Sequence, residues 1–310
     1  MKAIRFHRYG GSDVLAYEDA PRPVPGQGQV LVTVAATSFN PLDAALRAGY
    51  LHDVFPLELP HVPGIDVAGT IAELGPGVEG WAVGDAVIAF LPINADGAAA
   101  EHVLAPAEVL AAAPTTVPLA DAAALPAVGL TAWQSLFEHA RLRAGQAILV
   151  NGAGGAVGGY AVQLAASAGA RVVATASPRS AERVRGDGAE RVLDHTATPV
   201  TEAAGERFDV VLNLVATTPG DTAALTGLVA DGGVLVSTTT PGPEDPTRGV
   251  RSVRVLARSD AAQLAELVTR VDEGRLAVHV ADRRPLTDLA AVHDRAAAAG
   301  LPGKTVLLPA

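Results

Sequence analysis

The sequence predicts an α/β protein with two domains, one rich in short β-strands and one built on a doubly wound parallel sheet. The chain has 310 residues, about twice the roughly 150 residues of an average domain, and 49% of them are hydrophobic. The first third consists of short β-leaning runs between turns, whereas the residues after Pro118 alternate apolar strands with helical patterns. Such alternation is typical of a parallel sheet with right-handed crossovers.

The β-rich domain is expected over residues 1–117. Its β-leaning runs, separated by Gly- and Pro-rich turns, are Lys2 to Phe6, Gln29 to Ala36, Asp66 to Leu74 and Asp85 to Phe90. Closely spaced short strands with such turns favour a barrel or a sandwich. The C-terminal pattern has a strand near Val278, a helix from Leu286 to Ala298 and a strand from Thr305 to Leu308. We expect this tail, residues 275–310, to rejoin the first domain.

The second domain is expected over residues 118–274. A helical pattern from Asp121 to Glu138 is interrupted near Pro126 and Gly129. Further helices are predicted at Val157 to Ser167, Ala181 to Arg185 and Ala261 to Glu273. The predicted strands are Ala147 to Val150, Arg171 to Thr175, Arg191 to Leu193, Phe208 to Leu214, Gly233 to Ser237 and Ser252 to Leu256.

Composition excludes several classes of function. The net charge of −10 argues against general nucleic-acid binding, because an acidic surface repels phosphate backbones. The chain has no cysteine, which excludes disulfides, thiolate catalysis and zinc sites that need sulfur. No apolar run reaches the roughly 18 residues that a membrane span needs, and the N-terminus lacks a signal-peptide core. We expect a soluble cytoplasmic protein.

One glycine-rich run carries the most information about function. After the strand at 147–150 the sequence reads Asn151-Gly152-Ala153-Gly154-Gly155-Ala156-Val157-Gly158. A turn nearly free of side chains, between a strand and a helix, lets the backbone approach a pyrophosphate at the helix N-terminus. Ala153 stands where the strict Gly-x-Gly-x-x-Gly pattern has its first glycine. Because strand, turn, helix and next strand follow in order, the run predicts dinucleotide binding.

The end of the next strand indicates which dinucleotide is bound. A cofactor without the 2′-phosphate is usually held there by an Asp or Glu that hydrogen-bonds the adenosine ribose. Here Ala176 and Ser177 occupy the position, and Arg179 follows closely. Loss of the acid and gain of Ser and Arg predict NADP(H), although the arginines of this segment could also form a solvated helix face.

The chain as a whole resembles a known family. Besides the glycine turn, the matching segments are Asn40-Pro41-Leu42-Asp43, Pro63 to Gly69, Gly84 to Val87, Gly129 to Trp133 and Gly303 to Leu307. Their order and spacing resemble the zinc-independent quinone oxidoreductases of the medium-chain dehydrogenase/reductase superfamily. The resemblance implies a GroES-like β-barrel domain and a Rossmann domain. It also implies chemistry without zinc, because Gly64-Ile65-Asp66 has Ile where zinc-dependent relatives have a His ligand.

The resemblance also implies the site residues. Asn40, Tyr50 and Thr131 are expected around the nicotinamide and the electron acceptor, with Asn40 orienting a carbonyl and Tyr50 stacking or donating a hydrogen bond. An Asx turn at Asn40 and a loop aromatic at Tyr50 are the structural alternatives. On the cofactor side the expected residues, in addition to the glycine turn, Ser177 and Arg179, are His195, Asn213, Leu214, Val215, Ser237 and Thr238.

The predicted activity is transfer of hydride from NADPH to a small electron-poor acceptor, either a quinone or an α,β-unsaturated carbonyl compound. Two alternatives stay open. One is an enoyl reductase acting on a polyketide or acyl thioester, and the other is an NADPH-binding sensor or scaffold with little catalysis. We also expect a homodimer through the second domain, because the strand 252–256 should be the unpaired edge of its sheet.

Overall fold

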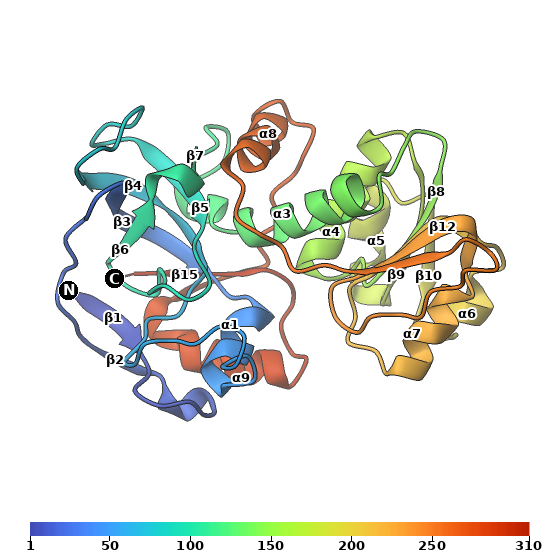
Figure 1. Ribbon diagram of the computed structural model, residues 1–310, viewed down its shortest axis with the longest axis horizontal. Coiled ribbons are helices and arrows are strands. Elements are labelled where there is room, and N and C mark those ends of the chain that lie inside the picture. The colour runs from blue at the N-terminus through green and yellow to red at the C-terminus, as the bar shows by residue number, and fades with distance from the viewer. Residues whose placement is uncertain (310) are drawn as a thin grey trace. The chain divides into compact units, whose positions relative to one another are not determined.

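A computed structural model describes residues 1–309 (Figure 1). The chain divides into two compact units. The barrel unit comprises residues 1–127 and the described residues from 259 onward, and the sheet unit comprises Val128–Arg258. The two units are described separately below.

The barrel unit is built mainly from antiparallel strands, with three short helices and one longer one. Its elements are β1 (Lys2–Arg5), β2 (Ala16–Asp19), β3 (Gln29–Ser38), α1 (Pro41–Ala48), β4 (Asp66–Leu74), β5 (Ala86–Phe90), β6 (His102–Pro106), β7 (Leu110–Ala112), α2 (Leu119–Ala122), α8 (Ala261–Asp272), β14 (Asp282–Pro285), α9 (Leu289–Ala297) and β15 (Thr305–Leu308). Three 3₁₀ turns, Ser12–Val14, Ala107–Val109 and Leu286–Asp288, connect them.

Strand β3 is the centre of the barrel unit. The sheet has the order β14-β15-β3-β4-β5-β7, and β6 pairs with the first half of β3. Alternate side chains of β3, at Val30, Val32 and Val34, point into one apolar core, as the period of two in a strand requires. The C-terminal strand β15 pairs with Thr37 and Ser38. The tail, which we expect to rejoin the first domain, thus pairs with the central strand of this unit.

The sheet unit has the order expected of a doubly wound Rossmann domain. Its elements are the π-helical turn Gln134–His139, β8 (Ala147–Asn151), α4 (Ala156–Ser167), β9 (Arg171–Ala176), α5 (Pro178–Gly186), β10 (Arg191–Asp194), α6 (Val200–Ala203), β11 (Phe208–Asn213), α7 (Pro219–Thr226), β12 (Val229–Ser237) and β13 (Arg251–Arg254). All strands are parallel, in the order β10-β9-β8-β11-β12-β13. Ile148, Leu149 and Val150 are buried in succession, as in sheets covered on both faces.

The division into units differs from the predicted boundaries at 118 and 274. Helix α3 (Pro126–Trp133) begins in the barrel unit and continues in the sheet unit. Hydrogen bonds tie the flanking residues to the barrel. The Ala127 N–H donates to Asp66 Oδ1 at 2.7 Å, the Ser259 hydroxyl donates to the Phe90 carbonyl at 2.5 Å, and Asp272 Oδ1 accepts from the Thr116 N–H at 3.0 Å. Residues 118–127 and 259–274 therefore belong with the barrel.

The prediction of a strand near Val278 was wrong. Residues 277–281 have no regular structure, and the strand lies at Asp282–Pro285, where it pairs with β15 in parallel. This polar stretch has no strand-like apolar pattern. Its place is fixed by ion pairs, because Arg283 forms two hydrogen bonds of 2.7 Å with Asp121, and Arg284 pairs with Asp282.

Candidate active site

The turn between β8 and α4 has the close-packed backbone that the sequence predicts. Gly152 has a φ of +97°, a conformation that side-chain-bearing residues rarely adopt. A Cβ on Gly158 would lie only 2.4 Å from the Gly152 carbonyl oxygen, so glycine allows α4 to approach the turn. The first N–H groups of α4 have no intrahelical acceptor and lie at the positive end of the helix dipole. The turn therefore fits a diphosphate group.

Hydrogen bonds between uncharged side chains run in series across the carboxyl ends of four strands beside this turn. Thr175 Oγ1 accepts from the Gly152 N–H at 2.8 Å and donates to Asn151 Oδ1 at 2.9 Å. Asn151 Nδ2 donates to Asn213 Oδ1 at 2.9 Å, and Asn213 Nδ2 donates to Ser237 Oγ at 3.3 Å. We call Asn151, Thr175, Asn213 and Ser237 the neutral network. All four are buried.

The sequence predicted two members of the neutral network as cofactor-side residues, through their backbone and not their side chains. Asn213 and Ser237 were expected to line the cofactor side, but the side chains of Asn151 and Thr175 were given no role. The signal was present, because each polar residue lies at or near the carboxyl end of an apolar strand, where parallel sheets bind ligands. The network fixes the Gly152 peptide and thereby the start of the turn.

Leu214, Val215 and Thr238 lie around the same turn. The Leu214 N–H donates to the Asn151 carbonyl at 2.9 Å, and the Thr238 N–H donates to the Asn213 carbonyl at 3.1 Å. A Cβ on Gly152 would lie 2.8 Å from Val215 Cγ2. The structure therefore brings these predicted residues together, and their contact with a cofactor stays a prediction.

The residues expected to recognise the adenosine end lie beyond β9. Ser177 is the N-cap position of α5, and both Arg179 and His195 are exposed. A hollow of about 310 Å³ opens here, lined by Ala176, Pro178, Ala181, Arg185, Val192 and Asp194. Arg185 therefore lines this hollow, whereas the sequence favoured Arg179 as the arginine that recognises the 2′-phosphate.

The barrel unit contains a buried cluster with formal charges. Lys304 Nζ lies 3.2 Å from Asp66 Oδ2 and donates to Asn40 Oδ1 at 2.7 Å. Asp66 Oδ2 also accepts from Asn40 Nδ2 at 2.8 Å and from the Ser38 hydroxyl at 2.5 Å. We call Ser38, Asn40, Asp66 and Lys304 the charged cluster, and each is at most 5% exposed. The segments of Asp66 and Lys304 both belong to the family resemblance, but nothing in the sequence indicated that their side chains form an ion pair.

The hydrogen bonds of Asn40 bear on its expected role. Its amide oxygen accepts from Lys304 and its amide nitrogen donates to Asp66. Its backbone N–H donates to Asp43 Oδ2 at 3.0 Å, in a capping box at the start of α1. Asn40 is therefore the N-cap residue of α1 with its side chain bonded to Lys304 and Asp66, and orientation of a substrate carbonyl by Asn40 stays a prediction.

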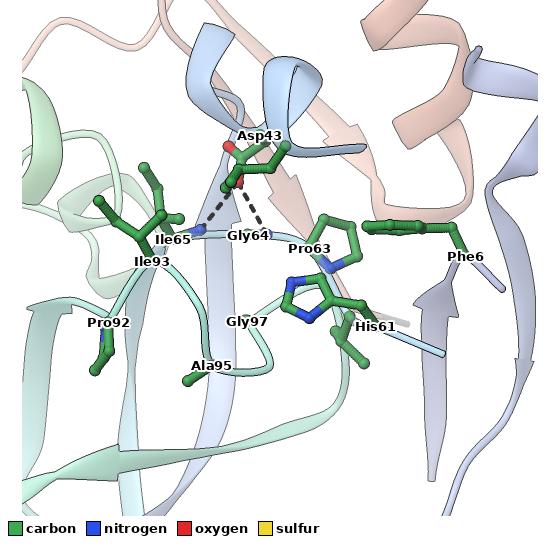
Figure 2. Close-up of a pocket in the computed structure, with 12 residues that line it drawn as sticks. Phe6, Asp43, His61, Pro63, Gly64, Ile65, Pro92, Ile93, Ala95 and Gly97 are labelled. Carbon is green, nitrogen blue, oxygen red and sulfur yellow. Dashed lines mark hydrogen bonds between the residues drawn. The ribbon is translucent and has the colours of Figure 1, made fainter. Parts of the chain in front are cut away.

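Asp43 connects α1 to the loop that precedes β4 (Figure 2). Its Oδ1 accepts from the N–H groups of Gly64 and Ile65 at 3.1 and 3.2 Å. Burial raises the pKa of Asp43 from 3.8 to about 6, and the nearby carboxylate of Asp66 contributes to the rise. A small cavity beside Asp43 is also lined by the buried His61 ring, whose pKa is lowered by burial.

The two remaining predicted catalytic residues are Tyr50 and Thr131. Tyr50 follows α1 and is 83% exposed. It lies at the opposite end of that helix from Asn40, and an eight-residue helix is about 12 Å long. Thr131 lies in the α3 residues of the sheet unit. The structure therefore does not bring Asn40 and Tyr50 into contact.

No group of three or more His, Cys, Asp or Glu side chains suited to a metal ion occurs within residues 1–309. The same residues contain no helix that is long and apolar enough to cross a membrane. Ile65, between Gly64 and Asp66, is 5% exposed. Asp66, the next residue, is paired with Lys304.

Comparisons with known proteins agree with this architecture. Residues 26–115 match the alcohol dehydrogenase GroES-like domain, and residues 188–307 match the family described as zinc-binding dehydrogenase. The chain is 33% identical over 306 residues to the chloroplast envelope quinone oxidoreductase homolog of Arabidopsis thaliana, covering 93% of this chain and 92% of that protein.

Two solved structures extend the comparison. The quinone oxidoreductase from Coxiella burnetii superposes with a TM-score of 0.89 at 27% identity, covering 99% of both chains. A mycobacterial protein complexed with NADPH superposes with a TM-score of 0.84 at 32% identity, covering 100% of both chains.

Proposed function

The chain belongs to the quinone oxidoreductase family of the medium-chain dehydrogenase/reductase superfamily, and we propose that it reduces a quinone or an α,β-unsaturated carbonyl compound with NADPH. The observation that carries this proposal is the turn of Gly152 to Gly158, whose backbone leaves room for a diphosphate at the start of α4. The NADPH complex of the mycobacterial relative supports the choice of cofactor.

The chemistry requires a hydride and a proton. NADPH, if bound at the glycine turn, would supply the hydride from its nicotinamide ring. A quinone that gains this hydride and one proton becomes a hydroquinone, and an enone becomes a saturated carbonyl compound. Neither step needs a Lewis acid of the kind that activates an alcohol. Ile65 and the Asp66–Lys304 pair fit this requirement, since the first offers no metal ligand and the second already neutralises its carboxylate.

The chain's own residues would position the reactants. The glycine turn binds the diphosphate through backbone N–H groups, and the neutral network holds that turn in place. Tyr50, with an exposed ring, is the candidate to stack on the acceptor or to donate a proton. We expect Tyr50→Phe to lower kcat with little change in NADPH affinity if its hydroxyl donates the proton.

The decisive experiment measures NADPH oxidation with a panel of quinones, enones and acyl thioesters. Turnover of quinones or enones supports the proposal, and preference for acyl thioesters would favour an enoyl reductase. A change in NADPH fluorescence without turnover of any acceptor would instead indicate a sensor or scaffold. The same preparation after heat denaturation is the control for NADPH oxidation that does not depend on the folded protein.

We further propose that Ser177 and Arg179 select the 2′-phosphate. Arg179→Ala should weaken NADPH binding by about 1–3 kcal/mol, the range for a charged hydrogen bond, and leave NADH binding unchanged. Arg185→Ala tests the competing assignment, because Arg185 lies on the same helix and lines the hollow, and a larger loss of NADPH affinity there would assign the 2′-phosphate to Arg185. Equal losses for NADPH and NADH would show that Arg179 does not recognise the 2′-phosphate.

We also propose a homodimer through β13, the edge strand of its sheet. The strand covers Arg251–Arg254, so it starts one residue and ends two residues earlier than expected. Val255 is buried, and its N–H donates to the Ser237 carbonyl at 2.8 Å. By alternation, the Arg254 N–H faces the open edge. Arg254→Pro should therefore lower the mass seen by light scattering from about twice 31.4 kDa to the monomer value. A monomeric wild type would contradict the dimer.

A further inference from the structure

Helix α5 carries three arginines, and one of them contacts the glycine turn directly. Arg183 Nη2 donates to the Gly154 carbonyl at 2.9 Å and lies 3.5 Å from the Ala153 carbonyl. Its Nη1 donates to Asp187 Oδ2 at 2.8 Å, and the Asp187 side chain is 5% exposed. The guanidinium is thus held by a buried carboxylate on one side and by two turn carbonyls on the other.

We propose that Arg183 is a positioning residue that sets the glycine turn for diphosphate binding, an inference that rests on the proposed function. In a planar trans peptide the C=O and N–H groups point in opposite directions. Anchoring the Ala153 and Gly154 carbonyls on Arg183 therefore turns the N–H groups of Gly154 and Gly155 away from α5. The Gly155 N–H closes the turn on the Gly152 carbonyl at 3.1 Å, and the Gly154 N–H is the one that this anchoring aims toward a diphosphate. A turn held in this way needs less ordering when a diphosphate binds.

The neighbouring helix α4 leaves space for this arginine. A Cβ on Gly159 would lie 2.7 Å from Arg183 Nη1, closer than such atoms approach one another. Gly159 lies inside a helix, where glycine is otherwise unfavourable relative to alanine. The close approach of the guanidinium to α4 gives a reason for glycine at this position.

The role of Arg183 differs from the one that we propose for Arg179. A residue that shapes the turn acts on the diphosphate, which NADPH and NADH share. A residue that recognises the 2′-phosphate acts on NADPH alone. The ratio of the two affinities therefore separates the roles, and it is independent of turnover.

The test measures the Kd of NADPH and of NADH by their fluorescence for the wild type, Arg183→Met and Gly159→Ala. We expect Arg183→Met to weaken both by about tenfold, the effect of losing a charged hydrogen bond, with an unchanged NADPH-to-NADH ratio. Gly159→Ala keeps the arginine but displaces its guanidinium. Measured well below Tm, where the variant is folded, it should weaken both cofactors with the same unchanged NADPH-to-NADH ratio as Arg183→Met. Arg207→Met, which removes an exposed positive charge from the same unit, should leave the NADH affinity unchanged.

The inference is overturned if Arg183→Met and Gly159→Ala bind NADH within twofold of the wild type. It is also overturned if Arg183→Met or Gly159→Ala weakens NADPH alone. If the wild type binds neither dinucleotide, the proposed function fails and the inference fails with it. If the wild type binds both and the variants do not differ from it, the inference alone fails.

Discussion

The charged cluster of the barrel unit and the neutral network of the sheet unit both offset the cost of burying polar side chains, but they use different chemical groups. Each buries four polar side chains and satisfies them with one another. The charged cluster uses a carboxylate and an ammonium group, Asp66 and Lys304. The neutral network uses only amides and hydroxyls, as in Asn151 and Thr175.

This difference predicts how each cluster responds to change. Removing one member of a buried ion pair leaves an uncompensated charge, which is more costly than an unpaired amide or hydroxyl. Carboxyl and imidazole groups titrate with pH, whereas amides and hydroxyls do not do so in the ordinary range. The barrel unit should therefore be the more sensitive of the two to charge removal and to pH.

The largest effect is expected from Lys304→Met, which leaves the Asp66 carboxylate buried without its cation. The free energy of unfolding should fall by about 3–5 kcal/mol, as measured by urea denaturation. Glu73→Gln is the control, because it breaks the exposed Arg22–Glu73 pair and should cost less than about 1 kcal/mol. Similar losses for the two variants would refute the distinction between buried and exposed pairs.

The next effect concerns pH and two buried groups of the barrel unit. Asp43, next to Asp66, has its pKa raised from 3.8 to about 6, so its stabilisation is greatest below pH 4 and is lost as pH rises through 6. Burial and the nearby Arg47 lower the pKa of His293 from 6.5 to about 4, so its stabilisation is present above pH 6.5 and is lost as pH falls through 4. Each change amounts to about 3 kcal/mol.

These opposing contributions nearly cancel in the wild type between pH 4 and 6.5. We expect Asp43→Asn to make the free energy of unfolding rise with pH over this window, and His293→Gln to make it fall. Denaturant titrations at several pH values measure both slopes. Parallel curves for the two variants would contradict the assigned pKa shifts.

A smaller effect is expected in the neutral network. Thr175→Val keeps the shape of the side chain but leaves the Gly152 N–H and Asn151 Oδ1 without their partner. The free energy of unfolding should fall by about 1–3 kcal/mol, by the same amount at pH 5 and pH 8. Thr175→Ser retains the hydroxyl and should recover most of the loss. A pH-dependent loss would show that the network is coupled to a titrating group.

The smallest effect is expected from removal of metal ions. Asp66 is already paired with Lys304, and Ile65 cannot bind a metal ion. Dialysis against a chelator should therefore leave both Tm and NADPH-dependent activity unchanged. Stoichiometric zinc in the purified protein, lost together with activity, would contradict this expectation.

Local sequence was sufficient to predict the fold class and the glycine turn. Strand periodicity, Gly and Pro at turns and the run from Asn151 to Gly158 all depend on neighbours within a few residues, and these signals survive without tertiary contacts. The same reasoning predicted the return of the C-terminal strand Thr305–Leu308 through its apolar pattern and the family resemblance.

Tertiary structure decided which polar residues meet. Asp66 and Lys304 are 238 residues apart in the sequence, and Asn151 and Asn213 are 62 apart. The polar strand Asp282–Pro285 is held in place by the hydrogen-bonded ion pair between Arg283 and Asp121. Among the arginines of α5, only the packing against Gly159 and the carbonyls of the turn distinguished Arg183 from Arg179. Such pairings depend on how strands and helices come together, because hydrogen bonds and charges act between neighbours in space, whatever their separation along the chain.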